Sequence, residues 1–264
     1  MRRPILLAFT VGFLLLDSLC AYSDETVPVA KSGGGTYPLP LHDENAMREL
    51  QGLAGNEPVK LEILSPEGNE VLSTREVVVK YRLENFEVGQ PEPGQHVHVI
   101  LDNKPYEADY TPDGSIVFKD VPEGTHTLFL FAARKFHLSL KNDGAFDSMT
   151  FHVLKNDGEN APLPNEPLLV YSRPKGSYSQ ADGSAENVML DFYLRNVILS
   201  QEGYRVRVTV NGGDPVYLAD WEPIILLHQP PIGDYVITLE LVDQNDQAVP
   251  GPFNATTRTI KIVP

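Results

Sequence analysis

The sequence contains little cysteine, little positive charge and no long hydrophobic segment. Its 264 residues include 1 Cys, which excludes a disulfide scaffold and every cysteine-rich zinc or iron–sulfur site. With 21 basic and 36 acidic side chains the formal charge is −15. This charge argues against nucleic acid as a partner, because that binding begins with Lys and Arg neutralising phosphates. No segment reaches about 18 consecutive apolar residues, the length that predicts a transmembrane helix.

The N-terminus has the order of a secretory signal peptide. Arg2 and Arg3 precede a largely apolar run over residues 5–16, and small and polar residues follow it. We therefore predict a leader over residues 1–23 and an extracytoplasmic protein, either periplasmic or secreted. A lipoprotein signal has a leucine three residues before its cysteine and a small residue just before it. Cys20 has Asp17 and Leu19 at these positions, so we do not expect a lipid anchor there.

Residues 24–56 are typical of a flexible linker. They contain the run Ser32–Gly35 (SGGG) and the proline-rich run Tyr37–Pro40 (YPLP), neither of which is expected to contribute a packed element. Asp43 is placed to cap a short helix in which apolar residues recur near helical spacing up to Leu53.

The rest of the chain contains an internal repeat. Asn56-Glu57-Pro58 recurs as Asn165-Glu166-Pro167, an offset of 109. The pattern Tyr-x-Ala-Asp-aromatic-x-Pro occurs over residues 106–112 and again over residues 217–223. Several further blocks match at nearly the same offset, so we infer that one module of roughly 100 residues was duplicated.

Each copy has the pattern of an all-β module. Apolar and polar residues alternate in His96–Val99 and in Val206–Val210, and turn signals such as Asp113-Gly114 separate the strands. About seven short strands in about 100 residues predict an antiparallel β-sandwich. We therefore predict two tandem immunoglobulin-like sandwiches, over residues 57–156 and 165–264.

Two motifs carry a family resemblance. Pro122-x-Gly124-x-His126-x-Leu128 and the segment Gly94–Asp102 (GQHVHVILD) resemble the immunoglobulin-like or fibronectin-III-like modules of exported bacterial proteins. The resemblance covers both copies and implies a fold without an active site.

The first copy holds most of the histidines. His96 and His98 are two residues apart on one strand, hence on the same face, where two imidazoles could share Cu²⁺ or Zn²⁺. We include His152 in this candidate metal set. The alternative is an exposed polar face, because the repeat aligns these three histidines with cations, namely Arg205, Arg207 and Lys261. His126 aligns with Tyr235, and we expect its ring to face the core and contact backbone.

The repeated aromatic block is a second candidate site. An exposed ring beside a carboxylate, as in Asp109/Tyr110 and Asp220/Trp221, could stack on a sugar while the acid binds its hydroxyls. The alternative is structural: the tyrosines that begin each block pack inward and the aspartates cap turns.

An acidic run in the second copy suggests calcium. Asp243–Asp246 (DQND) offers hard oxygen ligands, but it lacks the EF-hand spacing. A turn that uses Asp and Asn for local backbone bonds is the alternative.

Catalytic motifs are missing from the sequence. It contains no Gly-x-Ser-x-Gly, HExxH, P-loop or Rossmann glycine pattern. We therefore predict an exported, non-enzymatic binding protein with a protein or glycan partner at the cell surface or in the periplasm, and without a required cofactor. The alternatives are a periplasmic copper- or zinc-binding accessory protein and a structural spacer.

Overall fold

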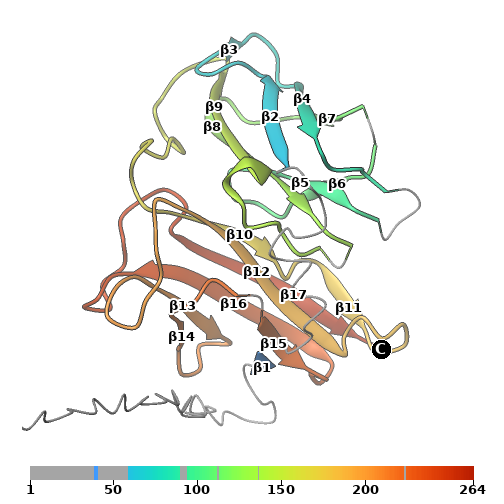
Figure 1. Ribbon diagram of the computed structural model, residues 1–264, viewed down its shortest axis with the longest axis vertical. Helices are drawn as coiled ribbons and strands as arrows, with labels where there is room; N and C mark the ends of the chain where they lie inside the picture. Colours follow the sequence, from blue (N-terminus) through green and yellow to red (C-terminus); the bar gives the residue numbers. More distant parts are fainter. Residues whose placement is uncertain (1–38, 41–58, 90–93, 112, 136, 223) are drawn as a thin grey trace, which may run out of the picture.

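A computed structural model describes residues 39–40, 59–89, 94–111, 113–135, 137–222 and 224–264 (Figure 1). The predicted leader, residues 1–23, and the helix predicted after Asp43 lie outside the described residues. Within the described residues no helix is long and apolar enough to cross a bilayer.

The first module is a sandwich of two sheets. The smaller sheet has the order β2 (Lys60–Ser65), β4 (Val77–Glu84), β7 (Ser115–Phe118). The larger sheet has the order β3 (Val71–Leu72), β9 (Phe146–Val153), β8 (Gly124–Ala133), β5 (His96–Leu101), β6 (Glu107–Asp109). A 3-10 turn, η1 (Asp143–Ala145), precedes β9.

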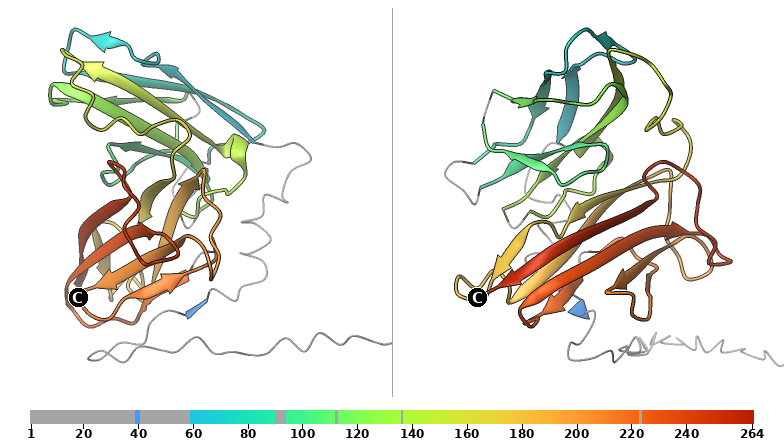
Figure 2. Two further views of the ribbon diagram at one scale, coloured as in Figure 1. Left: turned by 90° about the vertical axis from the view of Figure 1, so that its left-hand side faces the viewer. Right: turned by 180° about the vertical axis from the view of Figure 1, so that it is seen from behind.

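The second module repeats this arrangement, as Figure 2 shows from behind. One sheet has the order β15 (Ile224–His228), β12 (Asn187–Arg195), β10 (Leu168–Arg173). The other has the order β11 (Ser177–Ser179), β17 (Ala255–Val263), β16 (Gly233–Val242), β13 (Arg205–Val210), β14 (Val216–Leu218).

Strand register confirms the predicted duplication. His96 pairs with Ala133 between β5 and β8, and Arg205 pairs with Val242 between β13 and β16, so both partners shift by the same offset. Among the described residues each module contributes eight strands of its own, β2–β9 and β10–β17, where seven were expected, because the first strand is split. After β2, and again after β10, the chain crosses to the opposite sheet, where β3 and β11 run parallel to β9 and β17.

The predicted linker contributes one unexpected strand. β1 (Leu39–Pro40) pairs antiparallel with Ile225 and Ile224 of β15. The expectation that this segment forms no packed element is therefore wrong. Proline is tolerated on an edge strand, because the missing N–H need not take part in the ladder.

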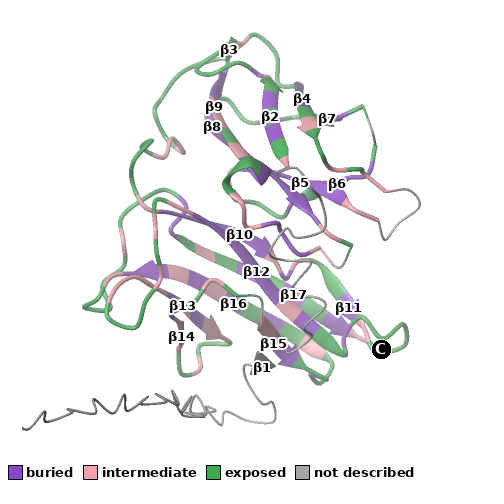
Figure 3. Ribbon diagram, viewed as in Figure 1, coloured by how far each residue is buried: buried purple, intermediate pink, exposed green. Residues whose placement is uncertain are grey.

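Four apolar clusters form the interior of the described residues, and the smallest consists of Ala132, Leu140 and Ala145. One lies inside the first module between its sheets, and another lies inside the second. A third joins the modules: Ile100, Phe129 and Phe131 on the outer face of the larger first-module sheet pack against Val170 and Tyr193 of β10 and β12. Figure 3 shows β5 and β10 as buried strands at this junction.

Polar contacts fix the junction in one orientation. The Arg258 guanidinium of β17 donates to the carbonyls of Tyr171 and Ser172 at 2.7 Å and reaches the Asn103 carbonyl of the first module at 3.1 Å. The Asn103 side chain accepts from Tyr171 N at 2.8 Å. Because these groups are buried, the two bonds of Asn103 to the second module specify how the modules sit on one another.

Candidate functional site

Three histidines of the first module converge beside this junction. His96 and His98 lie on β5, and His137 lies in the loop that joins β8 to β9. One ring nitrogen from each lies within 4.8 Å of the others. His96 Nε2 is 2.9 Å from His98 Nε2 and 2.8 Å from His137 Nδ1.

The hydrogen bonds around the cluster fix the protonation of its central ring. His96 Nδ1 lies 2.8 Å from the Gly94 carbonyl and therefore carries the proton. In the neutral ring Nε2 then has a single lone pair, which can accept one well-aligned hydrogen bond. Two imidazole nitrogens nevertheless approach that atom, so the protein alone does not satisfy this arrangement. A cation bound between the three nitrogens would satisfy it.

The rings are neutral at physiological pH. Burial lowers the pKa of His96 and lowers that of His98 well below its ordinary value. Burial and then the charge of Arg173 lower the pKa of His137 to about 3. Neutral imidazole is the form that binds transition metals, so burial prepares these side chains as ligands.

Aromatic rings and a second-module hydroxyl enclose the cluster. Tyr106 stacks on His98 with ring centroids 3.6 Å apart, and Tyr110 lies 4.6 Å from His96. His98 Nδ1 lies 3.1 Å from Ser172 Oγ on β10, the first strand of the second module. The orientation of His98 therefore depends on both modules.

The histidines are buried, which contradicts the expected solvent-facing surface. His96, His98 and His152 are 1%, 0% and 2% exposed. The alignment of His96 and His98 with Arg205 and Arg207 had the correct register. It did not reveal that the second module packs against the face of β5 that carries the histidines, whereas the equivalent face of β13 has no such cover among the described residues. A cation in one copy does not predict exposure in the other once the copies pack asymmetrically.

His152 does not belong to the cluster. Its Nδ1 lies 3.0 Å from Thr125 Oγ1 on β8. His98 pairs across the sheet with Phe131, six positions further along β8, or about 20 Å at the usual rise of a strand. The inclusion of His152 in the metal set is wrong, because alternation predicts the face of a strand and not the position along it.

His137 is the ligand that the sequence prediction missed. It adopts a left-handed backbone, with φ of 59°, in the loop after Ala133. Because Ala133 pairs with His96, residues just beyond Ala133 must lie close to His96. The register of β5 with β8 could have identified it, had that pairing been derived from the repeat.

The aromatic block is structural in the first module. Tyr106 is buried as its structural interpretation expected, and the Asp109 carboxylate accepts from Thr111 N at 2.8 Å and from the Tyr81 hydroxyl at 2.8 Å. Tyr110 is only 6% exposed, so the expected exposed ring is absent here.

In the second module only Trp221 of this block lies against the junction. Tyr217, which the structural interpretation expected to pack inward, is 37% exposed, so that expectation is wrong for this copy. Asp220 is exposed, but Trp221 is half-buried and donates from Nε1 to the Phe192 carbonyl at 2.9 Å. Lys141 of the first module lies over the indole ring, 4.9 Å from its centroid. Trp221 therefore packs between modules and does not offer a free face for a sugar.

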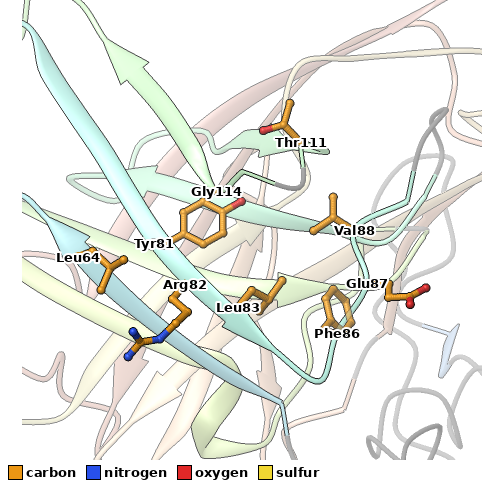
Figure 4. Close-up of a pocket in the computed structure, with 9 residues that line it drawn as sticks. All are labelled: Leu64, Tyr81, Arg82, Leu83, Phe86, Glu87, Val88, Thr111 and Gly114. Carbon is orange, nitrogen blue, oxygen red and sulfur yellow. The ribbon is translucent and has the colours of Figure 1, made fainter.

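A groove of about 590 Å³ lies at one end of the small first-module sheet (Figure 4). It is lined by Leu64, Tyr81, Arg82, Leu83, Phe86, Glu87, Val88, Thr111 and Gly114. The Tyr81 hydroxyl is engaged by Asp109, so the polar tip of the largest lining side chain already has a partner. None of the three cluster histidines lines this groove.

The two remaining sequence expectations concern His126 and the acidic run. His126 is buried and its Nε2 lies 2.8 Å from the Pro122 carbonyl, which confirms the expected core-facing ring in contact with backbone. In the acidic run, Asp243 Oδ1 accepts from the backbone N–H groups of Asn245 at 2.8 Å and Gln247 at 2.9 Å. This carboxylate caps a turn, as the alternative to a calcium site expected.

Strand order assigns the fold of each module. In immunoglobulin lettering β2, β4 and β7 are strands A, B and E of one sheet, and β5, β8 and β9 are strands C, F and G of the other. Each module is an immunoglobulin-like or fibronectin-III-like sandwich. No protein-family model matches the sequence, and no curated protein matches it.

Solved structures of low similarity share this class. Fibronectin(III)-like modules of CbhA from Clostridium thermocellum are 15% identical, covering 76% of this chain and 92% of that chain, with a TM-score of 0.25. The FN1–FN3 domains of chicken CNTN1 are 14% identical, covering 77% of this chain and 65% of that chain, with a TM-score of 0.24. At these scores the fold assignment rests on the strand order, and no function is transferred.

Proposed function

We propose that the protein is an exported, non-catalytic binding protein whose ligand is a copper or zinc ion held by His96, His98 and His137. The observation that carries the proposal is the approach of two imidazole nitrogens to the single lone pair of His96 Nε2. A metal ion would replace both contacts, and three imidazoles form a donor set that suits Zn and Cu.

The surrounding hydrogen bonds support the same role. Metal-bound histidines usually donate their second ring N–H to a carbonyl or other acceptor, which fixes the tautomer and the ring plane. Gly94 supplies such a carbonyl for His96, and Ser172 Oγ is placed to do so for His98. Together with the leader predicted over residues 1–23, the site favours an extracytoplasmic metal-binding accessory protein over a glycan binder or a spacer.

Metal uptake tests the proposal directly. The purified protein is titrated calorimetrically with Zn²⁺ and with Cu²⁺, and we expect one equivalent to bind. His137→Ala removes the half-buried ligand from a loop and should weaken binding by more than about 10-fold, the lower bound for loss of even an outer-shell partner.

His152→Ala is the matched control. It removes a buried histidine of the same module that lies outside the cluster, and it should leave uptake unchanged. Circular dichroism checks that both variants fold. Absence of binding at micromolar metal, or equal uptake by the His137→Ala variant, would overturn the metal assignment and leave the spacer role.

A further inference from the structure

Building on the proposed metal site, we infer that it selects monovalent copper over divalent zinc and copper. The inference depends on the charge of the donor set, the charges around it and the number of ligands that it offers.

The donor set carries no negative charge. Among the described residues the cluster consists of three histidines, without a carboxylate or a thiolate. His96 and His98 are almost completely buried, so water screens the bound ion poorly. The idealised cost of burying an ion rises with the square of its charge, so it is about four times larger for a divalent than for a monovalent ion of equal size.

The neighbouring charges are positive. The Lys175 ammonium lies 3.9 Å from the centroid of the Tyr106 ring, and His98 stacks on the same ring at 3.6 Å. The ammonium and the imidazole must occupy opposite faces of the Tyr106 ring. The Tyr106 ring alone therefore separates the Lys175 ammonium from His98. Arg173 lies near enough that its charge, like that of Lys175, disfavours positive charge on all three histidines. A divalent ion meets twice the repulsion that a monovalent ion meets.

The coordination also suits a low-coordinate ion. Zn²⁺ is almost always tetrahedral and needs a fourth ligand, either from the protein or from water. The rings of Tyr106, Tyr110 and Phe131 flank the histidines. Among the described residues no fourth His, Cys, Asp or Glu joins the three histidines. Imidazole suits copper as well as zinc, and three imidazoles leave Zn²⁺ one ligand short of its usual four.

Affinity for each ion under matched conditions tests the inference. The whole protein is titrated with Cu⁺ under anaerobic conditions against a chromophoric Cu⁺ chelator, and with Zn²⁺ and Cu²⁺ by calorimetry. We expect the dissociation constant for Cu⁺ to be lower than that for Zn²⁺ by roughly 100-fold, given two cations close to a poorly screened site.

Lys175→Met tests the electrostatic cause. It removes the charge while keeping the length of the side chain. Affinity for Zn²⁺ should therefore rise more than affinity for Cu⁺, and the ratio of the Zn²⁺ to the Cu⁺ dissociation constant should fall. Lys104→Met, at an exposed lysine that forms an ion pair with Asp102, is the matched control and should leave the ratio unchanged.

The outcomes separate the two proposals. Tighter binding of Zn²⁺ or Cu²⁺ than of Cu⁺, still lost in the His137→Ala variant, would overturn the selectivity and leave the metal site standing. An unchanged ratio in the Lys175→Met variant would overturn its electrostatic basis. Failure of all three ions to bind would overturn the proposed function itself.

Discussion

At the scale of single residues, the neighbours of the buried histidines shift their pKa values in opposite directions. In the cluster, burial and neighbouring cations lower the pKa of each ring. At His126 burial also disfavours the charged ring, but the hydrogen bond and charge of Asp102 and the Pro122 carbonyl outweigh it and raise the pKa. Asp102 Oδ2 lies 2.7 Å from His126 Nδ1 and 3.9 Å from the Lys104 ammonium.

This pair gives stability a defined dependence on pH. Because the folded pKa of His126 is raised, its contribution is complete below the unfolded value of about 6.5 and is lost as pH rises through the folded pKa. His126→Gln should destabilise the protein by about 1.5–3 kcal/mol below that pH, and by less at about pH 9.

Urea unfolding of the wild type and the variant across this pH range measures the difference. The cluster histidines are present in both proteins, so their contribution to the free energy of unfolding cancels from the difference. His228→Gln, at an exposed histidine, should show no comparable dependence. A difference that stays constant with pH would contradict the charged pair.

The sequence predicted residue identities at the site better than their surroundings. Alternation placed His96 and His98 on one face, which the structure confirms. It could not show that the face is covered, since the side chains that cover it belong to residues more than 60 positions away, such as Ser172. His137 was missed because a loop residue has no periodicity to reveal it.

At the scale of elements, β8 and β16 show how the duplicated modules diverged. Every residue of β8 (GTHTLFLFAA) is buried, whereas buried residues recur at every second position over most of β16 (GDYVITLELV). Phe129 and Phe131 stand where β16 has Thr238 and Glu240. The uninterrupted apolar run was therefore the sequence signal that this strand is buried on both faces.

Substitution at the equivalent positions tests this divergence. Phe129 is fully buried and meets Phe253 of the second module edge to face, with ring centroids 5.2 Å apart. Phe129→Ala should cost about 3–5 kcal/mol of unfolding free energy, because it leaves a cavity in the junction.

Thr238→Ala, the matched change in β16, should cost less than about 1 kcal/mol, because that side chain bonds only an exposed threonine across the strands. Chemical denaturation of both variants provides the comparison. A similar loss of unfolding free energy in the two variants would show that the outer face of β8 is not packed more deeply than that of β16.

At the scale of the whole molecule, an apolar cluster and buried hydrogen bonds join the two sandwiches. The fold class and the duplication were predictable, because hydrophobic period and turn residues are local signals. The junction was not, since it arises from the packing of two outer faces, and the module boundaries at 57–156 and 165–264 stay predictions. Arg258 and the Lys141–Asp191 ion pair are two polar links across the junction. Burial lowers the pKa of Arg258 to about 10, so it is still charged at neutral pH.

Loss of this guanidinium should loosen the junction. Arg258→Met keeps the bulk of the side chain but leaves buried carbonyls, including those of Tyr171 and Asn103, without their donor, at about 1–3 kcal/mol for each unsatisfied group. We expect a larger radius of gyration by small-angle scattering and faster proteolysis within residues 157–164.

Arg207→Met is the control for a lost arginine. Arg207 bonds Glu240 on a partly exposed face of the second module and does not contact the first in the described contacts. It should leave both measurements unchanged. A compact, protease-resistant Arg258→Met variant would show that the apolar cluster and the other polar contacts, such as Lys141–Asp191, hold the modules together without this guanidinium.

The apolar junction also bears on whether the first module could stand alone. Without the second module, the first module would expose a contiguous apolar surface that contains Ile100, Phe129, Phe131 and Phe146. Patches of that kind on a free domain favour self-association and aggregation. A module that stands alone is therefore expected to carry a more polar face there, like that of β16. Shielding of this surface from water is thus a property of the pair of modules, and a variant chain that lacks the second module is expected to self-associate.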